Sequence, residues 1–279
     1  MADKKTDGLL RRTVLKLREG KTSEEVDVLA REEPLELRVE GETLMVTMRT
    51  PGADRELALG FLYAEGVISG AADLGQLVHC GRPGDEGFGN ILDALPAPGF
   101  AINADAVGLA RRGTLTTAAC GVCGRQSIDD LHERLSTQPV RSTMRREALT
   151  RGMEQLRARQ PLFELTGGIH GAALLLENGD LSLVAEDVGR HNAVDKVIGM
   201  ALFEEPDASL RPWKALIVSG RLSYEIVQKA AAFQVPVVAA VSAPSSLAVE
   251  VAESFGISLC GFVRGDRMNI YTHAERLSV

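Results

Sequence analysis

Two cysteines stand at a spacing that can do chemistry: Cys120 and Cys123, in the sequence CGVCG. Each is followed by a glycine, which leaves the backbone loose and the thiols accessible. A helix predicted to begin at Ser127 would bring the positive end of its dipole near the sulfurs, and Arg125 adds charge of the same sign. Both effects lower the pKa of a thiol and raise its thiolate fraction, so the pair is predicted to be reactive.

Three chemistries use a Cys-x-x-Cys pair. The pair can be a dithiol/disulfide couple, half of a zinc site, or a thiolate that accepts a sulfane sulfur as a persulfide and passes it on. Zinc would need further ligands from His79, Cys80 or Cys260, and none of these forms a second Cys-x-x-Cys. We therefore assign no metal ligand, and we interpret Cys80 and Cys260 as small buried side chains.

A polar segment, EDVGRHN at 186–192, stands where a predicted strand meets a predicted helix. Two interpretations remain open. The segment is either a functional site or a capping loop, in which Asp187 or Asn192 accepts hydrogen bonds from the start of the helix. His170, earlier in the chain, is either a neighbour of this segment or a polar residue that is satisfied elsewhere.

Three short apolar runs in the last third of the chain are typical of buried parallel strands. They lie at 215–219, 237–241 and 257–263, with helical patterns at 222–233 and 246–255 between them. Polar loops follow the runs: SGR at 219–221, SAPSS at 242–246 and RGDR at 264–267. Ligands of open α/β sheets bind outside such strand ends, and hydroxyls, arginines and helix N-termini suit a phosphate. Because Asp266 could accept the paired N–H donors of guanine, a nucleotide-like ligand is predicted.

The other elements follow from periodicity and turn residues. Hairpins are predicted over 35–48, and over 172–185 with an Asn178-Gly179 turn. Helices are predicted over 54–66, where Asp54 caps the start, and over 127–136 and 143–160. The glycine-rich loop at 81–90 does not match GxGxxG, and no GxxxxGK[ST] occurs, so neither a Rossmann fingerprint nor a P-loop is predicted.

These elements predict an α/β protein in three regions. Residues 1–28 are a polar arm or an added first strand, residues 29–125 are β-rich and end in the Cys-x-x-Cys loop, and residues 126–279 form an α/β region that binds the ligand. Strands that alternate with helices in this last region imply a parallel sheet.

Composition excludes several classes of protein. Hydrophobic residues make up 45% of the 279, enough for a packed core, while aromatic residues make up only 4%, so the core is aliphatic. The net charge of −7 argues against a nucleic-acid binder. No apolar run approaches the roughly 18 residues of a membrane helix, and the charged start lacks a secretory signal. Four cysteines are no disulfide framework, so a reducing, cytoplasmic compartment is expected.

Taken together, these segments resemble the FdhD family, the formate dehydrogenase accessory sulfurtransferases. The resemblance spans roughly residues 30–276 and leaves only the N-terminal arm unplaced. Its most specific carrier is EDVGRHNAVDKVIG at 186–199. The other carriers, in chain order, are EEPLELRVEGETLMVTMRTPG at 32–52, ELALGFLYAEGVI at 56–68, CGVCG at 120–124, TGGIHGAAL at 166–174, SGRLSYEIVQKAA at 219–231, SAPSSLAVEVAE at 242–253 and GFVRGDRMNIYTHAERL at 261–277.

The resemblance implies a sulfurtransferase. Cys120 would take sulfur from a cysteine desulfurase as a persulfide, with Cys123 as its partner, and pass it to the molybdenum (or tungsten) bis-guanine-dinucleotide pterin cofactor, which then serves the catalytic subunit of formate dehydrogenase. A guanine nucleotide such as GDP could occupy the same site. The cofactor-binding stretch carries over to Phe262, Val263, Arg264, Gly265, Asp266 and Arg267, and the loop argument adds Ser219 and Arg221.

The resemblance also implies a homodimer and a fold like that of the cytidine deaminases, with a parallel or mixed sheet, flanking helices and a smaller N-terminal β-rich part. The deaminase zinc signature is absent, because no His-x-Glu precedes a Pro-Cys-x-x-Cys, so deaminase activity is not expected. Two alternatives remain. One is a non-catalytic chaperone that binds and delivers the molybdenum cofactor, and the other is a zinc-stabilised redox sensor.

Overall fold

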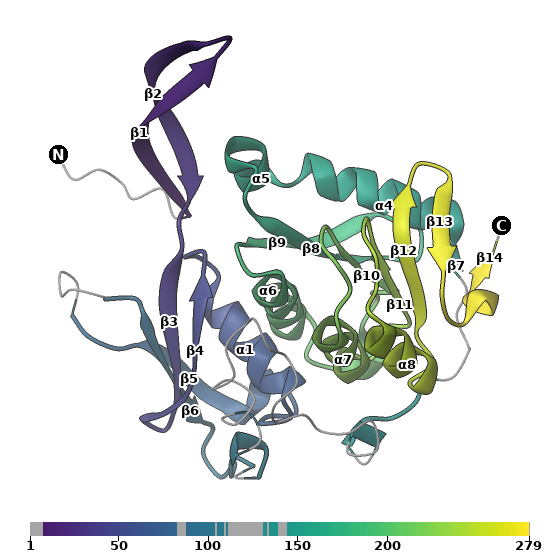
Figure 1. Cartoon of the computed structure of the whole chain (residues 1–279). Helices are drawn as coiled ribbons and strands as arrows, with labels where there is room; N and C mark the ends of the chain where they lie inside the picture. The colour runs from purple at the N-terminus through teal and green to yellow at the C-terminus, as the bar shows by residue number, and fades with distance from the viewer. Residues whose placement is uncertain are drawn as a thin grey trace.

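The computed structural model describes residues 8–82, 88–103, 105–108, 110, 131–132, 134–138 and 144–278. Within these residues the chain forms a six-stranded sheet flanked by helices, a four-stranded sheet, a projecting two-stranded hairpin and a short strand pair near the C-terminus (Figure 1). The predicted α/β fold, with a mixed sheet and a smaller N-terminal β-rich part, is confirmed.

The six-stranded sheet has the strand order β13-β12-β11-β10-β8-β9. Its strands are β8 (His170–Leu175), β9 (Leu181–Asp187), β10 (Ala215–Val218), β11 (Val237–Ala240), β12 (Ser258–Arg264) and β13 (Arg267–Ile270). The predicted parallel strands β10, β11 and β12 lie side by side, and β8 joins β10 antiparallel. The predicted hairpin is formed by β8 and β9, and β13 folds back on β12. The sheet is therefore mixed, with a parallel centre.

Helices cover both faces of this sheet. On one face lie α6 (Arg190–Glu204), α7 (Tyr224–Phe233) and α8 (Ser246–Ser254), and on the other lies α4 (Arg146–Ala158), followed by α5 (Pro161–Thr166). Alternate residues of one strand enter different cores. Leu216 packs in the main core with α6 and α7, whereas Ile217 packs in a second core with α4. Because both faces are buried, the central strands have continuous apolar runs instead of alternation.

The N-terminal part is a four-stranded sheet, in the order β4-β3-β6-β5, with one helix. Its elements are β3 (Glu33–Val39), β4 (Glu42–Arg49), α1 (Asp54–Ala64), β5 (Leu74–His79) and β6 (Ile91–Pro96). The predicted hairpin is confirmed as β3 and β4. Its turn residues Glu40 and Gly41 both have positive φ angles, 52° and 82°, as a tight hairpin turn requires.

The predicted cap of α1 is wrong. The helix begins at Asp54, but its N-cap is Ala53, and no side chain caps it. The Asp54 carboxylate is instead held by the buried guanidinium of Arg49, with Oδ1 2.9 Å from Nε and Oδ2 3.0 Å from Nη2. Leaving a buried arginine without a charged partner costs more free energy than leaving a helix end uncapped, so the Asp54 carboxylate pairs with Arg49.

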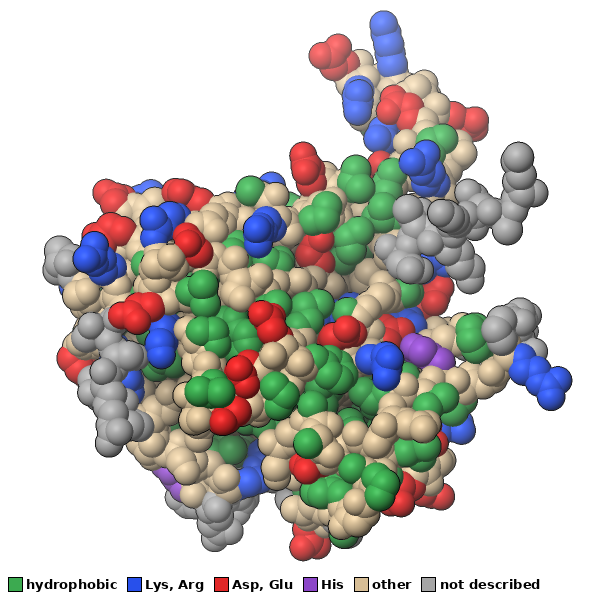
Figure 2. Space-filling view, turned by 180° about the vertical axis from the view of Figure 1, so that it is seen from behind, with side chains coloured by type: hydrophobic (Ala, Val, Ile, Leu, Met, Phe, Trp, Pro, Cys, Tyr) green, Lys and Arg blue, Asp and Glu red, His purple; other side chains and the backbone are tan. Residues whose placement is uncertain are grey.

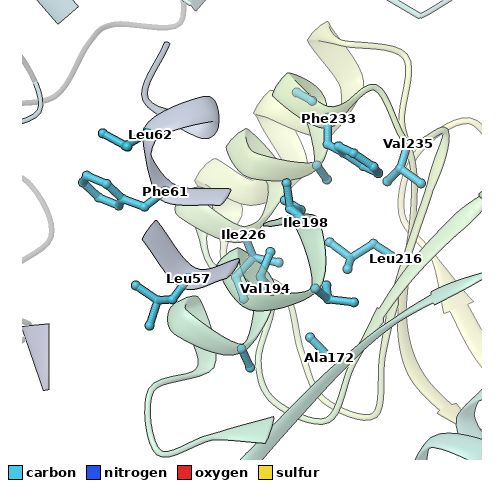
Figure 3. Close-up of a cluster of buried hydrophobic side chains, with 14 of the residues drawn as sticks. Leu57, Phe61, Leu62, Ala172, Val194, Ile198, Leu216, Ile226, Phe233 and Val235 are labelled. Carbon is cyan, nitrogen blue, oxygen red and sulfur yellow. The ribbon is translucent and has the colours of Figure 1, made fainter. Parts of the chain in front are cut away.

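Helices α1 and α6 join the two sheets into one core. In Figure 3, Leu57 and Phe61 of α1 lie on the same side of the sheet as Val194 and Ile198 of α6, and all four belong to the main core. The backbones approach so closely that a Cβ at Gly60 would overlap the carbonyl oxygen of Asp195. The proposed region boundary at 125/126 lies outside the described residues, but the core on either side of it is continuous.

The N-terminal arm forms a hairpin of β1 (Leu9–Arg18) and β2 (Lys21–Ala30) that stands away from the body (Figures 1 and 2). Sequence analysis offered a loose arm or a single added strand, because charged residues interrupt the apolar pattern. The hairpin buries little. Leu15 and Leu17 are 69% and 70% exposed, while Lys16 on the opposite face lies 3.5 Å from Asp27.

The remaining elements are short. They are η1 (Ala71–Asp73), η2 (Ala208–Leu210), η3 (Ala274–Arg276), β7 (Met144–Arg145) and β14 (Leu277–Ser278). The predicted helix at 143–160 begins only at Arg146, because the two residues before it pair with β14. Of the predicted helix at 127–136, the described residues 131, 132 and 134 are helical, whereas 135 and 136 are not, so the helix ends earlier than predicted. Among the described residues, no helix is both long and apolar enough to cross a membrane.

The contact between α1 and α6 generates a stability prediction. Gly199→Ala would drive a methyl group into the backbone of Glu56, and Gly60→Ala would do the same at Asp195. We expect each change to lower the free energy of unfolding by about 3 kcal/mol or more, measured by urea denaturation. Gly70→Ala is the control, because its Cβ meets nothing within 4 Å and its backbone is extended. Equal stability of all three variants would contradict close backbone packing.

Candidate functional site

The paired thiols lie outside the described residues, as does the predicted helix start at Ser127. The described residues on either side of that stretch, Ala110 and Leu131, are 3% and 0% exposed and belong to the main core. The structure therefore places the two ends of the thiol-bearing stretch against the core shared by both sheets. It does not test the assignment of Cys120 and Cys123.

The segment at 186–192 divides into two halves with different environments, and its first half is buried. The carboxylate of Asp187 is fully buried and lies 2.7 Å from the Nζ of Lys196. It also accepts hydrogen bonds from the backbone N–H of Thr50 at 3.1 Å and from the Nδ2 of Asn192 at 3.1 Å. We call these four residues, Thr50, Asp187, Asn192 and Lys196, the polar junction.

The polar junction connects the two sheets. Lys196 donates to the carbonyl of Thr50, Asn192 donates to the carbonyl of Met48, and the Thr50 hydroxyl accepts from the N–H of Val188. These contacts link the end of β4 to the segment that leads from β9 into α6. The capping interpretation is only partly right, because α6 has no side-chain cap. The polar-junction side chains instead form hydrogen bonds with backbone groups, and these bonds link the two parts of the chain.

Glu186, which opens the segment, is also structural. Its carboxylate accepts from the N–H groups of Leu162 and Phe163, at 3.0 and 2.8 Å, and thereby closes the start of α5. Burial is the main influence on this group and raises the pKa of Glu186 above its usual range, while the two backbone donors oppose that rise.

The second half of the segment faces the carboxyl edge of the sheet. The Nε2 of His191 lies 3.0 Å from the hydroxyl of Ser223, and its Nδ1 lies 2.7 Å from a carboxylate oxygen of Glu225. These contacts join the start of α6 to the start of α7, so two segments that sequence analysis singled out separately meet in space. The buried half is therefore structural, and the site interpretation stays a prediction for the second half.

His170 is a neighbour of this half. A Cβ at Gly220 would lie 3.2 Å from its Nδ1 and 3.7 Å from the Cδ of Arg190, so both side chains lie close to this loop. Burial, followed by the charges of Arg190, His191 and Arg221, lowers the pKa of His170 below its usual value. His170 is therefore neutral at pH 7, within a cluster of positive charge.

The predicted loops meet at one rim. A parallel bridge joins Leu222 to Pro244, and the N–H of Phe262 donates to the carbonyl of Ser242 at 3.2 Å. Arg221 and the turn Arg264–Arg267 are exposed on this rim, but the turn extends further out, because β12 is longer than β10 and β11. Ser219 is half-buried, and its hydroxyl accepts from the N–H of Gly171 at 2.8 Å.

Within the predicted cofactor-binding stretch, Phe262 and Val263 point in different directions. Phe262 has a φ of 54°, in the left-handed region, beside a register shift between Gly261 and Arg264. This bulge turns the ring outward, where it is 45% exposed. Val263 is 1% exposed and packs in the second core, so its side chain faces the interior. A strained aromatic residue at a bulge is a mark of functional sites.

Comparisons with known proteins bear on these motifs. The model of the FdhD/NarQ family matches residues 30–278. The chain belongs to the FdhD/NarQ family. Among its relatives, "Sulfur carrier protein FdhD" of Anaeromyxobacter sp. (strain K) is 55% identical over 257 residues, covering 91% of this chain and 89% of the relative. The protein of the same name from Streptomyces coelicolor is 45% identical and covers 96% of this chain and 95% of the relative.

A solved structure supports the fold of this family member. A "putative formate dehydrogenase accessory protein from Desulfotalea psychrophila" superposes with a TM-score of 0.73 at 22% sequence identity, covering 97% of this chain and 99% of that one. At this identity the likeness shows the fold alone. The family resemblance predicted from the sequence is confirmed.

Sequence analysis missed a pocket in this FdhD/NarQ family member. A cavity of about 460 Å³ lies between α4, α5 and the sheet edge, with His170, Ser219 and Val241 in its wall. Gln160, also in the wall, is only 3% exposed, and its Nε2 has no hydrogen-bond partner among the described residues. The sequence gives no signal for this glutamine, because only the tertiary fold places its side chain in the wall of the pocket.

The other thiols differ from one another. Cys260 is buried as predicted, and burial raises its pKa to about 12, so it is an inert thiol. Cys80 is half-buried at the end of β5, so its predicted burial is only partial. Within the described ranges, no three or more His, Cys, Asp or Glu side chains are grouped as a metal site, and the zinc ligands considered from His79, Cys80 and Cys260 do not assemble among themselves.

The polar junction generates a second stability prediction. Lys196→Met leaves Asp187 charged and buried without its partner, so the free energy of unfolding should fall by about 3–5 kcal/mol in urea denaturation. Adding Asp187→Asn should restore part of this loss. Lys21→Met, on the exposed hairpin turn, is the matched control and should change stability little. A Lys196→Met protein as stable as the control would show that the buried pair is not needed to hold the sheets together.

Proposed function

We propose that this protein is a sulfur carrier for formate dehydrogenase. Cys120 accepts sulfur from a cysteine desulfurase as a persulfide, with Cys123 as its partner. The sulfur then passes to a molybdenum bis-guanine-dinucleotide cofactor at the rim of the six-stranded sheet, where a second copy of the chain completes a homodimer. The observation that carries this proposal is the family membership, with relatives at 45–55% identity named sulfur carrier proteins.

The loading step exchanges one sulfur atom between thiolates. The Cys120 thiolate attacks the outer sulfur of the desulfurase persulfide, and the sulfur–sulfur bond of that persulfide breaks. The bonding electron pair stays on the desulfurase cysteine, which leaves as a thiolate, so no external oxidant or reductant is required. A thiolate attacks fastest when its pKa lies near ambient pH, which fits a cysteine beside glycines and Arg125.

Delivery to the metal is a transfer of the outer sulfur. The bond between the two sulfurs breaks with its electron pair left on Cys120. The metal substrate, in its reduced state, supplies two electrons and holds the atom as sulfide. The chain's own task is to hold the anionic cofactor near the thiols while water and other nucleophiles are kept away.

The rim fits an anionic nucleotide. Among the described residues, no carboxylate forms an ion pair with the exposed guanidinium groups of Arg221, Arg264 or Arg267. Such groups can form paired, charge-assisted hydrogen bonds with phosphate. The ring of Phe262 offers a face on which a purine can stack, and Asp266 in the same turn can accept from a guanine.

Persulfide loading can be measured by mass. After incubation with a cysteine desulfurase and cysteine, the protein should gain about 32 Da, the mass of one sulfur atom, and Cys120→Ala should abolish the gain. Cys260→Ala is the control and should keep the adduct, because burial holds the pKa of Cys260 at about 12. An adduct that persists in Cys120→Ala and disappears in Cys123→Ala would reverse the two roles.

The nucleotide site can be measured by calorimetry with GDP. Arg264→Ala and Arg267→Ala should each weaken binding about tenfold or more, the value of one charge-assisted hydrogen bond. Arg11→Ala, an exposed arginine on the hairpin, is the matched control and should leave the dissociation constant unchanged. Unchanged affinity in both rim variants would remove this turn from the site.

A non-catalytic chaperone is distinguished by a separate experiment. If the protein only binds and delivers the cofactor, a Cys120→Ala/Cys123→Ala double variant would still restore formate dehydrogenase activity in cells that lack the native protein. Loss of rescue, together with retained GDP affinity, would favour sulfur transfer, since binding and transfer would then be separated.

A further inference from the structure

Three side chains at the edge of the sheet form a hydrogen-bonded chain that the proposed sulfur transfer does not use. The Ser223 hydroxyl lies 3.0 Å from the Nε2 of His191, and the Nδ1 of the same ring lies 2.7 Å from Glu225. The histidine comes from the start of α6, and the other two come from the start of α7. The order serine, imidazole, carboxylate is that of a nucleophile, a general base and the group that orients the base.

Hydrogen bonding determines which nitrogen carries the proton. A carboxylate can only accept, so the Nδ1 of His191 donates to Glu225. The hydrogen bond from His191 is the first cause that lowers the pKa of Glu225, to about 2, so this carboxylate is ionised at any pH near neutrality. In the neutral ring, Nε2 is then left with its lone pair facing the Ser223 hydroxyl. This is the tautomer that can remove a proton from serine.

Ser223 is placed for reaction instead of capping. It is the N-cap residue of α7, yet its side chain makes no cap hydrogen bond. The N-cap serine of α8, Ser245, shows the usual role, since its hydroxyl accepts from the N–H of Ala248 at 3.3 Å. The Ser223 hydroxyl is therefore diverted to His191, and the positive end of the α7 dipole lies beside it.

The charges around the three residues favour an anionic substrate. Arg190 precedes His191 in the chain, and both Arg190 and Arg221 lie close enough to influence the neighbouring His170; the proximity of Arg221 is also among the influences that lower the pKa of Arg190. The Nε of Arg190 has no hydrogen-bond partner among the described residues. Lys229, which also acts on Glu225, is held behind it by Asp195 at 2.7 Å. The side chains of His191 and Glu225 are 32% and 44% exposed, so substrate can reach them.

We propose that Ser223, His191 and Glu225 form a second reactive centre in which Ser223 is a nucleophile toward carboxylic or phosphoric esters that carry an anionic group. The serine oxygen bonds to the acyl carbon or phosphorus, and its proton moves to the Nε2 of His191. The bond to the leaving oxygen breaks, and that oxygen takes the proton from His191. Water then attacks the acyl carbon or phosphorus and gives a proton to the Nε2 of His191. The bond to the serine oxygen breaks, and that oxygen takes the proton back from His191. No oxidant or reductant takes part, and the centre uses neither cysteine.

The test is covalent labelling with a fluorophosphonate. Attack by Ser223 expels fluoride, so intact mass should rise by one phosphonyl group, and peptide mapping should place it on Ser223 and not on Ser245. Ser223→Ala should abolish the label. His191→Gln should slow labelling about 100-fold, and Glu225→Gln about tenfold, because base catalysis is lost or misdirected. Ser23→Ala is the control, since Ser23 contacts Glu25 without a histidine and should leave labelling unchanged.

A second measurement tests the proposal even if the fluorophosphonate does not fit into the site. In a Ser223→Cys protein, His191 should lower the pKa of the new thiol, so iodoacetamide should modify it about tenfold faster than in Ser223→Cys/His191→Gln. Circular dichroism of each variant verifies folding. The proposal is overturned if Ser223 is not labelled and the two cysteine proteins react at equal rates, or if labelling of Ser223 does not depend on His191. Persulfide loading is unaffected by either result, so this proposal and the sulfur-carrier proposal fail separately.

Discussion

The buried ion pair of Asp187 and Lys196 is the interaction on which the rest of the structure depends. Two charges removed from water are tolerable only when all their hydrogen bonds are made, and here the additional partners include the side chain of Asn192 and backbone groups at the end of β4. The pair therefore binds Thr50 to the start of α6, and Asn192 adds a hydrogen bond to the carbonyl of Met48. The same helix start carries Arg190 and His191, so the requirement for buried charge pairing also determines where those two side chains lie.

Close packing of α1 against α6 supports the same arrangement from the other side. Because Gly60 and Gly199 let the two backbones touch, the N-terminal sheet and the six-stranded sheet share one core instead of meeting at a surface. The strand ends, the α6 start and the flanks of the thiol-bearing stretch are therefore all attached to one packed body. The transfer that we propose, from a thiol to a bound cofactor, would need such a frame, because bond-making distances tolerate little error.

The carboxyl edge of the sheet concentrates groups that suit anions and proton transfer. Parallel strands β10, β11 and β12 end there together, so three loops from distant positions are brought side by side. The bulge at Phe262 adds an outward ring, and His170 and Arg190 lie close to the loop at Gly220. Burial, supported by the neighbouring positive charges, lowers the pKa of His170, while the hydrogen bond from His191 lowers the pKa of Glu225 to about 2. Each group thus has its protonation state set by its neighbours.

The sequence alone determined the features that depend on near neighbours in the chain. Period-two and continuous apolar runs predicted β3, β4 and β8 to β12, Asn178-Gly179 predicted a turn, and the ordered motifs identified the family. Tertiary structure decided which polar residues pair. Asp54 pairs with Arg49 instead of capping its helix, and Glu186 accepts hydrogen bonds at the start of α5. His191 contacts Ser223 and Glu225, which lie more than 30 residues further along the chain. Hydrogen bonds and ion pairs between distant segments depend on how the elements pack, and residue spacing carries no record of that.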